Sequence, residues 1–383
     1  MTKLSLALIA CVAFAACKRH VIDVDPVDTA EATEFAHRFA ALALPCDPVK
    51  LDELVDEDAL AAKFVEQTSA TGASIAADRL VDEHTGASVV CAGNAHAVAY
   101  KLLHVRDVAG DPRPVMRRLV TAPRTGVVAV AYDELQLGKS RRDHRVRVID
   151  IYYYLAGQTL SEMLSGVTDA VASSHGGDTL DLVQQIQAAR TLQQSGKFSE
   201  ALAKLDGLPQ DVRNSRALAI MRVNVANGLS VDAYRRALDD VARSFPNDPT
   251  IAMLEIDGAT LRGDYTAALA NIDIVDRAVG GDPFQNAVRA EILLKRGTVD
   301  DLHRAGELAD ALIRDEPDLK KAWYTQLDVT VALRDWTKAV GALDHLRTAF
   351  AVRINEDKLR ALPGNYAELL ATPEYASWNA SSR

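Results

Sequence analysis

Four polar side chains in the first half of the chain are of the types that perform acid–base chemistry. They are His104, Asp133, Asp150 and Tyr152. In the strand-like run RVRVIDIYYYL at 145–155, alternation places Asp150 on the same face as Val148. A carboxylate among apolar neighbours has a raised pKa and can act as a general base. We favour the competing interpretation, in which Asp150 holds a neighbouring arginine such as Arg117 or Arg147. These four residues are therefore the candidates for acid–base chemistry, and we predict no catalytic site.

Other sequence signatures of catalysis are absent. The nine histidines show no HExxH spacing, and the four cysteines form no CxxC pair, so no metal site is predicted. No P-loop, dinucleotide glycine pattern or GxSxG elbow occurs. We therefore expect no cofactor and no enzymatic activity.

The charge of the chain argues against nucleic acid as a partner. The 383 residues carry a net charge of −10, with a sequence pI of about 5.4. Residues 101–147 are nevertheless basic, and their charges alternate with apolar residues. Such alternation is typical of a solvated sheet face.

The N-terminus reads MTKLSLALIACVAFAACKRH, with a lysine, an apolar stretch from Leu4 to Ala16, and then a cysteine. This pattern is typical of an export signal and is too short to span a bilayer as a mature helix. Its end, Phe14-Ala15-Ala16-Cys17, resembles the lipobox of bacterial lipoproteins. The resemblance implies removal of residues 1–16, a lipid on Cys17 and a tether over 17–27. It also implies a periplasmic location, with anchoring at the outer membrane; ordinary secretory cleavage is the alternative.

Cleavage before Cys17 discards Cys11 and leaves two cysteines, Cys46 and Cys91. An even remainder is typical of an oxidising compartment and favours a disulfide between them. The bond would close a loop of 91 − 46 = 45 residues and stabilise the fold by about 4 kcal/mol. Two buried free thiols are the alternative.

The second half of the chain repeats itself. The stretch SGKFSEAL at 195–202 is similar to RGDYTAAL at 262–269, with related corners at NGL, RGT and LRD. Glycines and alanines recur with a period of about 34 residues; they are Gly196, Gly228, Gly263, Gly297, Ala201, Ala233, Ala268, Ala305 and Ala339. Arg262-Gly263-Asp264 is then a helix-to-helix corner rather than an adhesion signal, with Gly263 supplying the turn and Asp264 capping the next helix.

This period and the alanine pattern resemble the tetratricopeptide (TPR) repeat family. The resemblance implies an α-solenoid of about five units over 180–350, closed by capping helices over 351–383. Such proteins bind partners in a groove lined by the first helix of each unit. Carried onto this chain, the predicted groove residues are Arg190, Arg222, Met253, Asp257, Phe284, Glu291, Tyr324 and Asp328. A solvated helix face is an equally weighted alternative.

The first half belongs to a different domain. Helical runs at 26–45, 49–70 and 73–84 precede four strand-like runs between 100 and 155. This order favours an α+β fold with helices on one face of a curved antiparallel sheet. It resembles the NTF2-like cone folds over about 28–175. Such cones often enclose a pocket, so the resemblance implies a candidate pocket at His104, Asp133, Asp150 and Tyr152.

The whole chain is therefore expected to be mainly α, with an N-terminal α+β module before a TPR solenoid. We expect a lipid-anchored periplasmic adaptor or scaffold that binds a protein partner of the cell envelope. The alternative is a small-molecule-binding or catalytic NTF2-like module recruited by the repeats.

Overall fold

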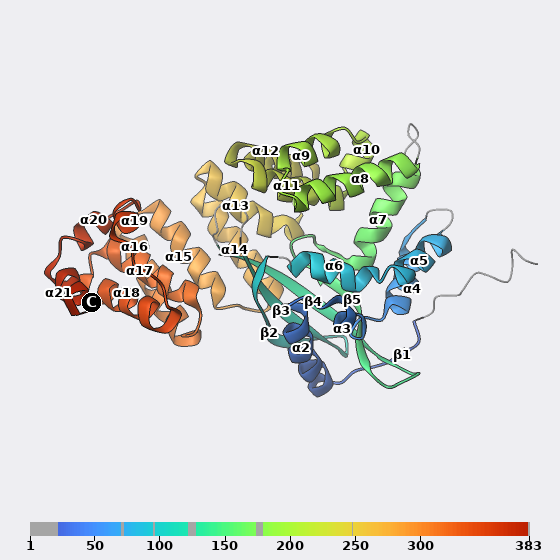
Figure 1. Cartoon of the computed structure of the whole chain (residues 1–383), viewed down its shortest axis with the longest axis horizontal. Coiled ribbons are helices and arrows are strands. Elements are labelled where there is room, and N and C mark those ends of the chain that lie inside the picture. Colours follow the sequence, from blue (N-terminus) through green and yellow to red (C-terminus); the bar gives the residue numbers. More distant parts are fainter. Residues whose placement is uncertain are drawn as a thin grey trace, which may run out of the picture. The chain divides into compact units, whose positions relative to one another are not determined.

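The computed structural model describes residues 22–69, 73–94, 96–121, 128–173, 179–246 and 248–381. Cys17 and the predicted signal peptide lie outside these residues. The described part is mainly helical, with one antiparallel sheet of six strands (Figure 1). The chain divides into two compact units between Ile251 and Ala252. Each unit is described by itself.

The sheet of the first unit is a meander of neighbouring antiparallel strands. Its order is β2 (Ala97–Val108), β3 (Asp111–Thr121), β4 (Val128–Ser140), β5 (Val146–Tyr153) and β6 (Gln158–Thr159), and β1 (Val24–Asp25) pairs with the end of β4. Ala109 and Gly110 connect β2 to β3, and both have positive φ, 55° and 86°. A two-residue turn with this backbone matches the twist of its strands and so fixes the hairpin.

A bulge in β5 changes which residues share a face. Gln136 pairs with Asp150, but Leu137 pairs with Val148, so Ile149 is an extra residue in β5. Val148 therefore joins the apolar core, whereas Asp150 points to the opposite face. The prediction that Asp150 and Val148 share a face is wrong, because strict alternation fails at a bulge.

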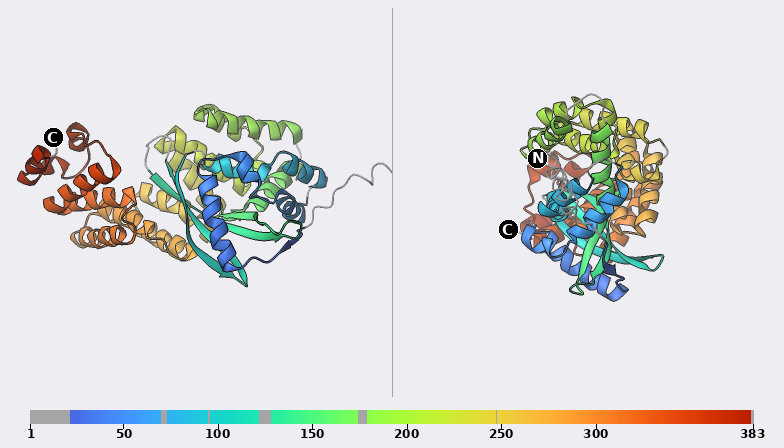
Figure 2. Two further views of the ribbon diagram at one scale, coloured as in Figure 1. Left: turned by 60° about the horizontal axis from the view of Figure 1, so that its bottom comes forward. Right: turned by 90° about the vertical axis from the view of Figure 1, so that its right-hand side faces the viewer.

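Helices cover both faces of this sheet. On one face lies α2 (Thr29–Ala43) (Figures 1 and 2). Its Phe35 and Phe39 share a core with Leu135 of β4. On the other face lie α4 (Glu57–Gln67) and α7 (Leu160–Ser173). The expectation of helices on one face is therefore wrong. The sequence did not predict the layer formed by α4 and α7, because polar residues such as Asp150 lie on the sheet face that it covers.

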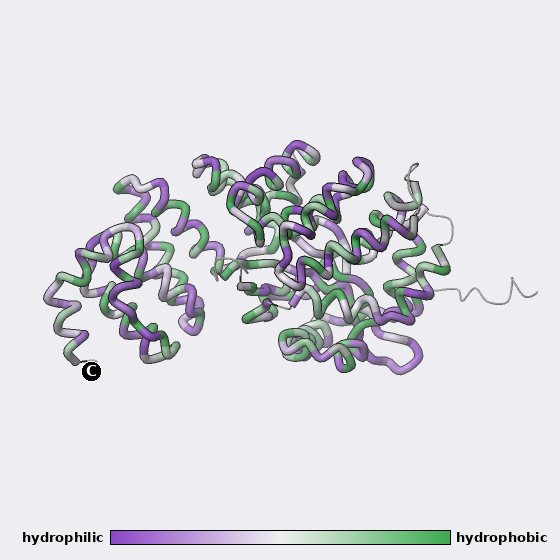
Figure 3. The backbone as a smooth tube through the Cα atoms, turned by 45° about the horizontal axis from the view of Figure 1, so that its top comes forward, coloured by the Kyte–Doolittle hydropathy of each residue, from purple (hydrophilic) through white to green (hydrophobic). Residues whose placement is uncertain are grey.

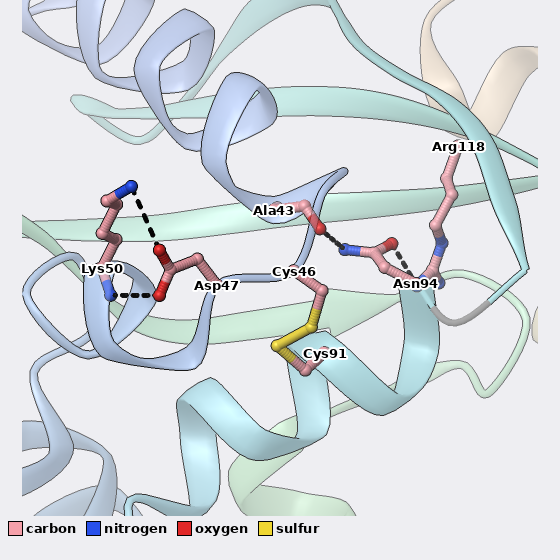
Figure 4. The surroundings of a disulfide bond; sticks show 7 residues. All are labelled: Ala43, Cys46, Asp47, Lys50, Cys91, Asn94 and Arg118. Carbon is pink, nitrogen blue, oxygen red and sulfur yellow. Dashed lines mark hydrogen bonds and ion pairs between the residues drawn. A yellow bond between two sulfur atoms is a disulfide. The ribbon is translucent and has the colours of Figure 1, made fainter.

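Three shorter helices complete this module: α3 (Pro48–Asp52), α5 (Ala73–Asp82) and α6 (Thr85–Asn94). The sequence did not predict α6, which is rich in small residues. The Glu57 carboxylate accepts hydrogen bonds from the N–H groups of Gly86 and Ala87, both 2.9 Å, and so caps its first turn. Cys91 of α6 forms a disulfide with Cys46, as the cysteine count predicts (Figure 4).

Helical pairs follow the α+β module. Their first and second helices are α8 (Thr179–Gln194) with α9 (Phe198–Asp206), α11 (Arg216–Leu229) with α12 (Val231–Ser244), α13 (Ala252–Arg262) with α14 (Tyr265–Val279), α15 (Phe284–Arg296) with α16 (Val299–Asp315), and α17 (Lys320–Leu333) with α18 (Trp336–Phe350). Short helices α10 (Gln210–Arg213) and η1 (Pro249–Ile251) flank the second pair. Hydrophobic and hydrophilic residues alternate along these helices, as in amphipathic helices (Figure 3).

The repeated alanines lie where each second helix meets its first. All five are buried, with at most 5% of the residue exposed; they are Ala201, Ala233, Ala268, Ala305 and Ala339. A methyl side chain lets two helix backbones approach closely. The burial of all five alanines fits close packing of the paired helices.

Three of the predicted corner glycines adopt left-handed backbone: Gly196, Gly263 and Gly297 have φ of 73°, 79° and 74°. At the third corner, Asp264 accepts a hydrogen bond of 3.0 Å from the N–H of Ala267 and caps α14. The prediction that Arg262-Gly263-Asp264 is a corner is confirmed.

Gly228 has another role. It lies inside α11, one residue before the helix ends at Leu229, and its φ is not positive. A Cβ atom here would lie 2.6 Å from Cζ of Phe198 and closer still to two other ring atoms. Glycine is therefore required by the packing of Phe198, and Ser230 caps the next helix instead.

Arg216 at the start of α11 joins the second helical pair to the sheet within the first unit. It donates to the carbonyl oxygen of Ala156, which follows β5, and to Asp248 and Thr250 beyond α12. Its guanidinium also lies 5.1 Å from the ring centre of Phe245. A buried charge with several partners is costly to separate, so the sheet and these helices form one body.

The last helices, α19 (Glu356–Arg360), α20 (Tyr366–Leu369) and α21 (Pro373–Ser381), cover the end of the second unit. Tyr366, Leu369 and Tyr375 share a core with Leu343 and Leu346 of α18. Within the described residues, no helix combines the length and the apolar character needed to cross a membrane.

We predict that Gly228→Ala destabilises the first unit by about 1–3 kcal/mol, because the new methyl group overlaps the Phe198 ring. Gly166→Ala in α7 is the matched control, since a Cβ there meets nothing within 4 Å. The control should be neutral or slightly stabilising. Urea unfolding followed by far-ultraviolet circular dichroism measures both variants. Equal stability of the two would contradict the packing role of Gly228.

We also predict that replacing Cys46 and Cys91 by serine lowers the free energy of unfolding of the first unit by about 4 kcal/mol, because the loop between them is no longer closed. Every tryptophan of the chain lies beyond Ala252, at positions 323, 336 and 378. Tryptophan fluorescence therefore reports the second unit, and its urea midpoint should not change. A shift of that midpoint as large as the shift seen by dichroism would contradict a local effect.

Candidate functional site

The structure does not bring the four predicted pocket residues together. Pairing across the strands places His104, Glu134 and Tyr152 in one row on the same face, with Val115 between the first two. Three strand spacings separate His104 from Tyr152, about 14 Å. Asp133 points to the opposite face, where it contacts Tyr100. These residues therefore belong to separate polar clusters.

Asp133 is the centre of a buried ionic cluster between the sheet and α2. Its carboxylate lies 3.1 Å from the Arg118 guanidinium and accepts a hydrogen bond of 3.0 Å from the Tyr100 hydroxyl. Arg118 also donates to Asn94, whose amide donates to the carbonyl oxygen of Ala43 (Figure 4). Burial raises the pKa of Asp133, whereas the Arg118 cation and the Tyr100 hydrogen bond lower it. The cluster links β3 and β4 to the ends of α2 and α6.

Asp150 is engaged in a second buried cluster. It accepts hydrogen bonds from the backbone N–H of Ile151 at 2.9 Å, and from the N–H and the hydroxyl of Ser161 at 3.2 and 2.5 Å. Burial raises its pKa, and the hydrogen bonds from Ser161 oppose that shift. The arginine predicted as the partner of Asp150 is replaced by Ser161 at the start of α7, and Arg147 pairs with Asp143 instead.

A third cluster contains Glu134, which the sequence did not single out. Glu134 is 3% exposed and receives hydrogen bonds from Arg106, Arg113 and the Tyr154 hydroxyl. These partners come from β2, β3 and the residue after β5, so only the register of the sheet brings them together. Burial raises the pKa of Tyr154 well above its usual value, with the Glu134 charge as the second cause.

The predicted groove residues fall in both units. In the first unit, Arg190 is exposed on α8. Arg222 on α11 lies 2.8 Å from Asp206 and 3.7 Å from Asp240, so its charge is already balanced by α9 and α12. A strongly basic end of the groove is therefore not present at Arg222.

In the second unit, α17 presents one face that carries Lys321, Tyr324 and Asp328, spaced by three and four residues. Lys321 pairs with Glu291 of α15. We call Glu291, Lys321, Tyr324 and Asp328 the first-helix face, because α15 and α17 are the first helices of their pairs. Asp257 occupies the matching position on α13 and is exposed.

The electrostatics of the first-helix face are coupled. Asp328 accepts a hydrogen bond from the hydroxyl of Tyr366 in α20. Burial raises the pKa of Asp328, whereas the Tyr366 hydrogen bond and the Lys321 cation lower it. Tyr324 is 37% exposed beside this carboxylate, and the ammonium of Lys320 lies 5.9 Å from its ring centre. The face thus offers an accessible aromatic ring within a network of paired charges.

Two predicted apolar anchors differ in accessibility. Phe284 begins α15 and is 2% exposed, so its ring belongs to the core of the second unit rather than to a binding surface. Met253 on α13 is partly buried. Tyr324 is therefore the accessible large side chain among the predicted anchors.

The second unit also has a hollow of about 440 Å³ between α16, α17 and α18. The Trp323 and His345 rings stack there with centres 3.6 Å apart, and Asp310 binds both Gln326 and Lys338 at its rim. Within the described ranges, no group of three or more histidine, cysteine, aspartate or glutamate side chains is arranged to hold a metal ion.

We predict that Arg118→Met destabilises the first unit by about 3–5 kcal/mol, because it leaves the buried Asp133 carboxylate without its cation. Removing Arg118 raises the folded-state pKa of Asp133 further above its unfolded value. Protonation of Asp133 then stabilises the folded variant at acid pH, and this stabilisation is lost as the pH rises through the folded-state pKa, so the deficit should grow with increasing pH.

Circular dichroism during urea unfolding measures this deficit. In the double variant Arg118→Met/Asp133→Leu no charge remains unpaired, so it should be more stable than Arg118→Met alone. A double variant as unstable as the sum of the two single variants would show that the pair is not coupled.

No family model matches this sequence, and no curated protein or solved structure is significantly similar to it. Function must therefore be argued from the geometry of these clusters and of the first-helix face.

Proposed function

We propose that this protein is a lipid-anchored periplasmic adaptor, held at the outer membrane through Cys17, that binds a protein partner with its helical pairs. The helical pairs have a period of about 34 residues and buried alanines at the helix contacts, which supports a TPR-like arrangement. The sheet with its preceding helices supports an NTF2-like module. In this proposal the module is a structural support, because its three polar clusters are engaged internally.

The accessible ring of Tyr324 within the first-helix face is the observation that carries the binding proposal. Tyrosine is enriched among residues that dominate binding energy, because its ring buries a large area and its hydroxyl retains a polar contact. Glu291, 38% exposed in its side chain, and Asp328 flank it. A partner segment with an apolar side chain against Tyr324 and a basic residue towards Glu291 fits this chemistry.

Because Glu291 already has a cation within the protein, binding does not depend on a charged residue of the partner. Lys321 is 16% exposed and pairs with Glu291, so the partner does not have to supply a cation for the carboxylate to be stable. Charged groups at such a rim chiefly influence orientation and association rate. Affinity in this proposal comes from the contact with Tyr324.

The experiment places a photo-crosslinking amino acid at position 324 in cells and isolates the adducts from the envelope. We expect a discrete protein adduct that becomes weaker when Glu291 is replaced by lysine, because the surface then repels a basic partner. The matched control carries the crosslinker at Arg314, which is 72% exposed on the second helix α16. No adduct from position 324, or the same adduct from both positions, would count against this face.

A further inference from the structure

The turn between β4 and β5 is an exposed basic segment of the first unit. Residues 139–147 contain five lysine and arginine residues and one aspartate. The whole turn is exposed; it consists of Arg141, Arg142, Asp143, His144 and Arg145. We call residues 139–147 the basic hairpin tip.

Several of these charges are balanced within the molecule. Lys139 lies 2.5 Å from Glu31, and Arg147 lies 2.5 Å from Asp143. Arg141 binds Asp23 and Asp25. For Arg142 and Arg145, by contrast, no side-chain ion pair forms with any other residue of the described ranges. These two arginines are the cations that remain for an external anion.

Strand β1 places this tip next to the N-terminal end of the described chain. Val24 pairs with Ser140, the residue immediately before the turn, so the start of the described chain lies beside the tip (Figure 1). Val24 is the seventh residue after Cys17, and an extended chain of seven residue steps spans at most about 25 Å. A lipid on Cys17 would therefore hold the tip close to the membrane surface.

We propose that the basic hairpin tip binds the anionic headgroups of the membrane that carries the lipid anchor, through Arg142 and Arg145. This inference rests on the proposed lipidation of Cys17. A basic patch next to a lipid anchor adds electrostatic attraction to anionic lipids. Each arginine near an anionic surface adds to membrane affinity, and the effect is confined to about a Debye length. The tip thereby orients the first unit at the bilayer.

Acidic neighbours limit the contribution of Arg142. It borders a polar hollow of about 490 Å³ that is also lined by Asp56 and Asp58. Arg145 does not line this hollow. The single variant Arg145→Gln therefore separates membrane binding from any role of Arg142 towards that hollow.

The test uses the non-acylated chain starting at Lys18, which retains every described residue, and vesicles with or without phosphatidylglycerol in phosphatidylcholine. We expect sedimentation with the anionic vesicles at low salt, and loss of it in high salt. Arg142→Gln/Arg145→Gln should bind about thirty-fold more weakly, and Arg145→Gln about five-fold more weakly. The matched control, Arg314→Gln/Arg360→Gln, removes the same charge from exposed positions of the second unit and should bind like the unchanged chain.

Equal binding to vesicles without phosphatidylglycerol, or unchanged binding of the tip variants, would overturn the proposal. Dichroism and tryptophan fluorescence verify that each variant is folded. Because the chain in this test is not acylated, a negative result would contradict membrane binding by the basic hairpin tip and would not bear on the lipidation of Cys17. Labelling of Cys17 with radioactive palmitate and the crosslinking at position 324 test the adaptor separately.

Discussion

Close contact between paired helices at a buried alanine is the interaction on which the helical part of this protein depends. Each second helix can bury its apolar stripe only if its backbone approaches the first helix, and a larger side chain at Ala268 or Ala305 would separate them. Between the first and second pairs a glycine has the corresponding role, since Phe198 of α9 occupies the space beside Gly228 of α11. Small residues therefore decide where large ones can pack.

In the first unit, polar contacts between distant segments have the corresponding role. Glu57 caps α6, Asp150 accepts a hydrogen bond from the N–H of Ser161 at the start of α7, and Arg216 donates to the carbonyl oxygen of Ala156. Each joins segments that are distant in sequence, and each is desolvated enough that losing one partner leaves a buried group unsatisfied. These contacts explain why the sheet module and the helices up to Ile251 form one compact unit.

The features predicted correctly from the sequence are those that depend on local interactions along the chain. The corners, the buried alanines and the cap at Asp264 follow from helix periodicity and turn chemistry, and these predictions hold. The disulfide followed from counting cysteines. Features that depend on tertiary contacts were missed: the bulge that turns Asp150 away from Val148, the helix α6, and the cluster around Glu134. Phe284 shows the same limit, because alignment of repeats identifies its position on the helix but not whether that position is covered.

The pairing of charges changes how recognition must work. The predicted groove positions include arginines and carboxylates, but Arg222 is neutralised by Asp206 and Glu291 by Lys321. A partner that relied on those charges would have to break existing ion pairs and would gain little. The exposed ring of Tyr324 is not part of an ion pair, so an apolar partner can gain free energy there by removing water from the ring. Specificity at the first-helix face is therefore expected to come from shape around Tyr324, with the surrounding ion pairs holding the helices that present it.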